Sequence, residues 1–175
     1  MTINNEIKNS LVFKLVEEQE VEKAFQLELK GYPIEEAATF EKLQYRQKHA
    51  PNLFLGDSTQ IRMIGFVVST LTRSKKLTEE SMSTHESDGK TICIHSVCID
   101  KNYQRLGIAT SLLKEYIERI LLLNNNDDVK KLHEKICLIA HKELIPLYEK
   151  VGFKLIGESE VVHGNEKWFD LEYEL

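Results

Sequence analysis

A run of seven residues between an apolar segment and an amphipathic one has the composition of a phosphate-binding loop: Gln104, Arg105, Leu106, Gly107, Ile108, Ala109 and Thr110. The first N–H groups of a helix lack intrahelical partners and lie at the positive end of the helix dipole, so they bind phosphate. Gly107 lets a ligand approach the main chain, and Arg105 adds a permanent positive charge. The run is neither a Rossmann fingerprint nor a P-loop. On its own it also fits an ordinary strand-to-helix connection.

The segments on either side of this loop have the periodicities of a strand and a helix. Residues 91–100 are rich in β-branched side chains and predict a buried central strand. Behind the loop, apolar residues recur at helical spacing as far as Leu123.

The rest of the chain alternates further strand and helix patterns. Strands are expected at 11–16, 52–55, 61–71, 135–141, 153–157 and 168–174, and helices at 18–30, 35–49 and 143–151. Polar connections are expected at 56–58, 72–90 and 124–128. This order predicts an α/β fold with a mixed sheet, and 175 residues suit one domain over residues 1–175.

Composition and charge argue against several classes of protein. A formal net charge of -5 disfavours nucleic acids and anionic membranes as partners. The three cysteines, Cys93, Cys98 and Cys137, form no Cys-x-x-Cys pair, which predicts neither a disulfide scaffold nor a zinc site. Residues 1–6 do not resemble a signal peptide, and no apolar run reaches membrane-spanning length. We therefore expect a cytoplasmic protein without a metal.

Several separate segments, in this order along the chain, resemble the GNAT N-acetyltransferase superfamily. They are Gly31-Tyr32-Pro33, residues 77–81, Ile94–Ile99 with the loop that follows, and Pro146-Leu147-Tyr148. The chain is similar in particular to arylalkylamine (serotonin) N-acetyltransferases and fungal polyamine acetyltransferases, from about Phe25 to its end. The resemblance implies a mixed sheet of about seven strands, splayed between the fourth and fifth, with about four helices. It also implies acetyl-CoA as co-substrate and the primary amine of a small molecule as acceptor.

The same resemblance implies where acetyl-CoA binds. In the family it lies in the opening between the central strand and the next parallel one. Its pantetheine arm would pair with the central strand at Val97, Cys98 and Ile99, and its pyrophosphate would sit on residues 104–110. Both follow the rule that backbone groups hold elongated or anionic ligands where a sheet opens.

The chemistry needs a base for the amine and an acid for the departing thiolate. A primary alkylamine has a pKa of roughly 10, so only about one molecule in a thousand is neutral at pH 7. His95 titrates in the right range for a base, and strand alternation places it on one face with Cys93, Val97 and Ile99. Family members carry two histidines here, where this chain has Cys93 and His95. Tyr148 matches the family tyrosine that protonates the thiolate.

The resemblance also implies an acceptor pocket shaped by Phe25, Pro33 and Cys93. Simpler interpretations remain open: Phe25 and Cys93 as core residues, His95 as a buried structural histidine, and Tyr148 as a packing residue. Glu35 and Glu36 follow Pro33; they would attract a second ammonium or merely cap a helix. We expect a monomer that acetylates small amines. The alternatives are acetylation of a protein lysine or N-terminus, and a non-catalytic acetyl-CoA-binding module.

Overall fold

The computed structural model describes residues 10–59, 62–125 and 132–175. Three expectations therefore lie partly or wholly outside the described residues. They concern the N-terminal segment 1–6, the start of the strand expected at 61–71, and residues 126–128 of a polar connection.

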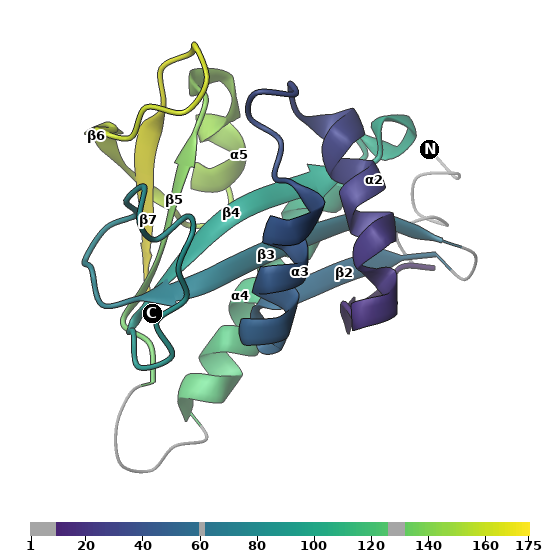
Figure 1. Ribbon diagram of the computed structural model, residues 1–175, viewed down its shortest axis with the longest axis horizontal. Helices are drawn as coiled ribbons and strands as arrows, with labels where there is room; N and C mark the ends of the chain where they lie inside the picture. The colour runs from purple at the N-terminus through teal and green to yellow at the C-terminus, as the bar shows by residue number, and fades with distance from the viewer. Residues whose placement is uncertain (1–9, 60–61, 126–131) are drawn as a thin grey trace.

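A seven-stranded mixed sheet runs through the middle of the molecule (Figure 1), with the strand order β1-β2-β3-β4-β5-β7-β6. Only the β4–β5 pair is parallel; every other neighbouring pair is antiparallel. The predicted α/β fold with a mixed sheet is confirmed. The strands are β1 Val12–Leu15, β2 Phe54–Ser58, β3 Met63–Thr72, β4 Thr91–Ile99, β5 Lys135–Ala140, β6 Lys154–Glu158 and β7 Phe169–Glu174.

The two parallel strands separate soon after they meet. Residues 91–93 of β4 pair with residues 135–137 of β5, and the ladder ends there although β4 continues to Ile99. The predicted splay between the fourth and fifth strands is confirmed. As a result, the second half of β4 has no strand neighbour on its β5 side.

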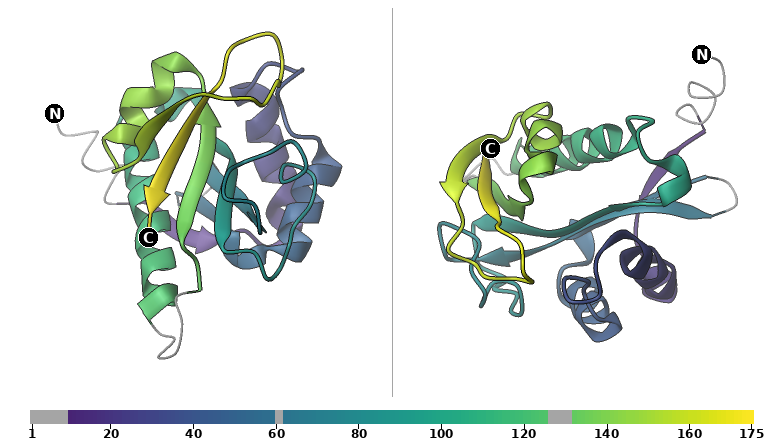
Figure 2. Two further views of the ribbon diagram at one scale, coloured as in Figure 1. Left: turned by 90° about the vertical axis from the view of Figure 1, so that its left-hand side faces the viewer. Right: turned by 90° about the horizontal axis from the view of Figure 1, so that it is seen from above.

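Helices cover both faces of the sheet (Figure 2). The α2 helix (Val21–Gly31) and the α3 helix (Phe40–His49) lie on one face; α4 (Ile108–Asn125) and α5 (Ile145–Glu149) lie on the other. Each pair packs over its own apolar cluster, the larger one under α4 and α5. All ten residues of β3 are buried, as expected for a strand covered on both faces.

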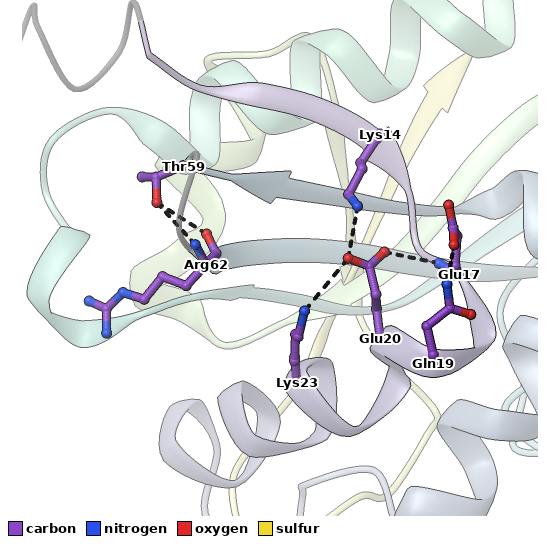
Figure 3. Close-up of polar contacts among 7 residues, drawn as sticks. All are labelled: Lys14, Glu17, Gln19, Glu20, Lys23, Thr59 and Arg62. Carbon is purple, nitrogen blue, oxygen red and sulfur yellow. Dashed lines mark hydrogen bonds and ion pairs between the residues drawn. The ribbon is translucent and has the colours of Figure 1, made fainter.

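A carboxylate joins the first strand to the start of α2. Glu20, at the end of a short 3-10 helix (Glu18–Glu20), accepts from the N–H of Glu17 and lies 2.8 Å from the Lys14 ammonium (Figure 3). Lys23 lies 3.9 Å from the same carboxylate. Glu17 and Glu20 form a capping box, in which side chains pair N–H groups that the start of the 3-10 helix leaves without backbone partners.

Several element boundaries differ from the sequence prediction, and local hydrogen bonds account for two of them. Residues 56–58 are strand rather than turn, and the connection lies between Thr59 and Arg62, which hydrogen-bond each other (Figure 3). The α3 helix begins at Phe40 rather than at residue 35, because Thr39 caps it by accepting from the N–H of Lys42. Both shifts follow from local polar contacts that apolar periodicity does not report.

No helix in the described ranges is both long and apolar enough to cross a membrane.

Asp57 is a buried acid in the middle of this sheet. It is fully inaccessible in β2, and neither carboxylate oxygen has a hydrogen-bond partner within the described structure. Burial raises its pKa from 3.8 to about 7, because the charged form is poorly solvated there.

We expect Asp57→Asn to remove a pH dependence of stability. Between pH of about 4 and about 7 the folded protein keeps a proton that the unfolded chain releases, so the wild type loses stability as pH rises. The slope is at most about 1.4 kcal/mol per pH unit and vanishes above about pH 7. Urea unfolding of both proteins across this range measures it; a difference between them that does not change with pH would contradict the expectation.

Candidate functional site

A β-bulge shapes the strand that carries the predicted base. Val68 of β3 pairs with Ser96 and Ser69 pairs with Ile94, so His95 is the extra residue. Beyond the bulge, Val97 and Ile99 pack on the cluster under α4, whereas His95 lines a cavity beside α2 and α3. The prediction that His95 shares a face with Val97 and Ile99 is therefore wrong, because a bulge reverses the alternation.

The hydrogen bonds around His95 define which nitrogen carries its proton. Its Nε2 lies 2.7 Å from the hydroxyl of Thr70, and that hydroxyl donates its only hydrogen to the carbonyl of Ser81. Thr70 must therefore accept from the Nε2–H of His95, an assignment made from the network. The lone pair is left on Nδ1, which is buried and has no hydrogen-bond partner among residues 10–59, 62–125 and 132–175.

The surroundings keep this imidazole neutral. Burial lowers the pKa of His95 well below its ordinary value, and the positive charges of Arg46 and Lys42 lower it further. At neutral pH the ring is therefore uncharged, and Nδ1 can accept a proton.

The cavity beside His95 is small and mixed in character. Its volume is about 30 Å³, enough for a water molecule. Its polar lining includes Glu28, Arg46, His95 and Ser96, and its apolar lining includes Leu77, Met82, Ile139 and Trp168. The Oε1 atom of Glu28 accepts from the Ser96 hydroxyl (2.9 Å) and from the N–H of Ala38 (2.8 Å). This cavity is the candidate acceptor site.

Three loops close over the cavity. The carboxylate of Glu36 lies 2.9 Å from Nε2 of His141, while Nε2 of His163 lies 3.0 Å from the Glu36 carbonyl. Trp168 donates to the His163 carbonyl and stacks on His141, with ring centroids 3.9 Å apart. The expected role of Glu36 as a helix cap is wrong, since its carboxylate pairs with His141. Sequence analysis missed this cluster because its members are distant in the chain.

A larger cleft, of about 750 Å³, contains almost every residue predicted to bind the cofactor. Leu106 is the exception, since it packs against the core under α4. The cleft is lined by Val97, Cys98, Ile99, Gln104, Arg105, Gly107, Ile108, Ala109 and Thr110, together with Tyr32, Tyr103, Tyr148 and Lys150. Sequence analysis did not identify Tyr103 or Lys150.

The backbone of the predicted phosphate loop is suited to an anion. Arg105 has φ 59° and Gly107 has φ 79°, both in the left-handed region, and α4 begins at Ile108. Left-handed residues of this kind curve a chain so that successive N–H groups form a concave anion-binding surface. The eighteen-residue α4 adds its positive end at the same place. A diphosphate therefore fits this loop.

Two tyrosines, Tyr32 and Tyr148, line the cleft. Tyr148, on α5, is 6% exposed, and burial raises its pKa above the ordinary value, so its hydroxyl keeps the proton. The Tyr32 hydroxyl donates to the carbonyl of Val97 (3.1 Å) and accepts from the N–H of Val97 (3.2 Å). In this state Tyr32 occupies backbone groups expected to pair with pantetheine. Sequence analysis noted Gly31-Tyr32-Pro33 but assigned Tyr32 no contact.

The residues predicted to shape the acceptor pocket do not all reach it. Pro33 lines an outer cleft of about 890 Å³ that shares Tyr32 and Glu36 with the cavity. Phe25 packs edge-on against Phe40, with centroids 5.7 Å apart, on the cluster between α2, α3 and the sheet. A role for Phe25 in the pocket stays a prediction that these contacts do not favour.

Cys93 is placed as a core residue. It packs in an apolar cluster that includes Leu77, Cys137 and Val161, and it does not line the cavity. Burial raises the pKa of its thiol to about 12, so the thiolate is scarce at neutral pH. Its predicted contact with substrate is untested, and this environment does not favour it.

Comparison with known proteins agrees with this geometry. The family model described as the Acetyltransferase (GNAT) domain matches residues 58–175. Serotonin N-acetyltransferase from Mesocricetus auratus is 27% identical over 125 residues, covering 71% of this chain. The match spans only 57% of that relative's length.

Solved structures show the same fold at low identity. The GphF GNAT-like decarboxylase in complex with isobutyryl-CoA has a TM-score of 0.76 and 10% identity, covering 93% of this chain and 98% of its own. A chimera of spermidine N-acetyltransferase SpeG from Vibrio cholerae and hSSAT has a TM-score of 0.64 and 17% identity, covering 94% of this chain and 95% of its own. Likeness at this level concerns the fold alone. Since the family model spans more than half of the sequence, the chain belongs to the GNAT acetyltransferase family.

Proposed function

We propose that this protein transfers acetyl from acetyl-CoA to the primary amine of a small molecule, by direct attack within a ternary complex. The proposal rests on the position of β4, which lines both the cavity beside His95 and the larger cleft. Residues 94–96 line the cavity, residues 97–99 line the cleft, and Tyr32 lines both. A donor in the cleft and an acceptor in the cavity would meet where β4 parts from β5. An arylalkylamine is the acceptor class suggested by the relative, and a polyamine is the other.

The cleft has backbone and charged groups that suit acetyl-CoA. When bound, acetyl-CoA supplies an activated acetyl thioester. The loop at 104–110 would hold its diphosphate, with Arg105 and Lys150 adding positive charge. The N–H of Val97 would polarise the thioester carbonyl, as in an oxyanion hole. Tyr32 must first release that N–H. Binding of the donor is thereby linked to movement of a residue that also lines the acceptor cavity.

His95 would serve as the general base. Its free Nδ1 can take a proton from the ammonium, directly or through a water in the cavity. A base is needed because only about one alkylamine molecule in a thousand is neutral at pH 7. Cys93 is not proposed as an acyl carrier, because its pKa of about 12 leaves it protonated.

Tyr148 would serve as the general acid. Its raised pKa keeps the hydroxyl protonated in the cleft, and a thiol has an ordinary pKa near 8.5. Proton transfer from Tyr148 to the departing thiolate restores the thiol of CoA. The ammonium loses two protons on becoming an amide: one would pass through His95 to solvent, and the other would replace the proton that Tyr148 donated.

The proposal predicts release of free CoA with small amines. The panel is serotonin, phenethylamine, spermine and a lysine-containing peptide, with calorimetry of acetyl-CoA binding in parallel. Gly107→Val should lower acetyl-CoA affinity tenfold or more, since a β-branched residue is strained at φ 79°. Lys114→Gln, at an exposed position two turns further along α4 and outside the cleft, is the control. Turnover of the peptide alone would favour protein acetylation instead, and binding without CoA release would favour a non-catalytic module.

We expect His95→Ala to lower kcat/KM about 100-fold or more. In the wild type the acidic limb of the kcat/KM profile should lie below pH 6.5, the ordinary pKa, because the site depresses the pKa of His95. His85 is a suitable control, since its pKa is also lowered by burial but it does not line the cavity. An unchanged profile in His95→Ala, or a limb that moves equally in His85→Ala, would remove His95 from the mechanism.

We expect Tyr148→Phe to leave acetyl-CoA binding intact while turnover falls, because only the proton donor is lost. Calorimetry and steady-state kinetics separate the two effects. Leu147→Met, also in α5 and lining the cleft, controls for altered packing. Full turnover by Tyr148→Phe would exclude it as the acid.

A further inference from the structure

Three buried polar atoms without partners belong to residues that line the cavity beside His95. They are Oε2 of Glu28, Nη1 of Arg46 and Nδ1 of His95. Glu28 is 1% exposed and Arg46 is 3% exposed, so bulk water does not reach them. Buried atoms of this kind are rare in native proteins, and each calls for a partner that the described part of the chain does not provide.

The other polar atoms of Glu28 and Arg46 hold both side chains in place. Oε1 of Glu28 is engaged by Ser96 and Ala38, and Nη2 of Arg46 donates to the carbonyl of Met82 at 3.1 Å. The positive charge of Arg46 acts on the Glu28 carboxylate, with no direct hydrogen bond between their free atoms in the described structure. The cavity is therefore lined by one residue with a free acceptor oxygen and by one with a free donor nitrogen.

The donor and acceptor requirements limit which group can satisfy both atoms. An ammonium only donates, so it would leave Nη1 of Arg46 without an acceptor. A carboxylate only accepts, so it would leave Oε2 of Glu28 without a donor. A hydroxyl carries no charge, donates one hydrogen and accepts through its lone pairs, so it suits both atoms at once.

We propose that Glu28 and Arg46 recognise a hydroxyl on the acceptor, positioned near its amine, so that the preferred substrates are amino alcohols rather than polyamines. The inference rests on the proposed function, with His95 receiving the amine's proton. His95, Glu28 and Arg46 line one cavity of about 30 Å³, so the amine and the hydroxyl would lie close together there, while the rest of the acceptor would extend into the outer cleft that shares Tyr32 and Glu36. In the free protein a water can take the hydroxyl's place.

A matched set of amines tests this directly. Phenylethanolamine has a hydroxyl beside the aminomethyl carbon, phenethylamine lacks it, and tyramine has it on the far side of the ring. We expect the CoA-loaded protein to bind phenylethanolamine at least tenfold more tightly than either, because an acceptor without that hydroxyl leaves buried charges unpaired. Calorimetry on the CoA complex measures this without requiring turnover.

Variants identify the residues responsible. Arg46→Met should reduce the preference for phenylethanolamine over phenethylamine to about twofold or less. Lys42→Met, which removes the other cation lining the cavity, should keep that preference. Each preference is a ratio of two affinities within one variant, so any effect of the mutation on His95 applies to both amines and cancels. Thermal melting checks folding, and Glu28→Gln, which keeps the side-chain size, provides a second test if Arg46→Met is unstable.

Three results would overturn the inference: equal binding of phenylethanolamine and phenethylamine, a preference for tyramine alone, or a preference retained in both Arg46→Met and Glu28→Gln. Failure of the proposed function would look different. In that case no amine would release CoA, whatever calorimetry shows for the pair.

Discussion

The early end of the parallel ladder between β4 and β5 is the constraint on which the rest of the site depends. Residues 91–93 hold the two strands together, and beyond them the backbone of β4 has no strand neighbour on that side. Unpaired backbone groups inside a protein need partners. Tyr32 satisfies those of Val97 in this structure, and an extended ligand would satisfy them in its place. Residues 94–96 of the same strand line the cavity, residues 97–99 line the cleft, and Tyr32 lines both, so this one strand carries both halves of the proposed site.

The bulge at His95 turns this side chain to the opposite face of the sheet from Val97. Without it, His95 and Val97 would point to the same face, and base and donor site would crowd one side of the sheet. With it, His95 faces Arg46 and the α2–α3 layer, where burial and positive charge keep the ring neutral. Bulges commonly re-aim side chains at functional sites. Here the extra residue is itself the proposed general base.

Two buried charged residues in the cavity, Glu28 and Arg46, are only partly hydrogen-bonded. Glu28 and Arg46 are held by Ser96, Ala38 and Met82, yet each keeps one atom unpaired. Burial lowers the pKa of Arg46 to about 10 and raises that of Glu28, which reflects the cost of both charges. A neutral group that donates to Oε2 of Glu28 and accepts from Nη1 of Arg46 would satisfy both free atoms.

Local sequence patterns were sufficient for the order of strands and helices, the mixed sheet, and the loop from Gln104 to Thr110, because periodicity and helix-start chemistry act over a few residues. Other features could be seen only in the folded structure: the bulge at His95, the hydrogen bond between Tyr32 and the backbone of Val97, and the Glu36–His141 contact. Residues far apart in sequence meet there, and only tertiary packing decides their register. The sequence by itself identified the strand segment 97–99 and the loop at 104–110 as candidate binding backbone, and His95 as the candidate base. The tertiary structure decided the face to which His95 points and the atoms left unpaired around it, because burial and charge depend on neighbours from other elements.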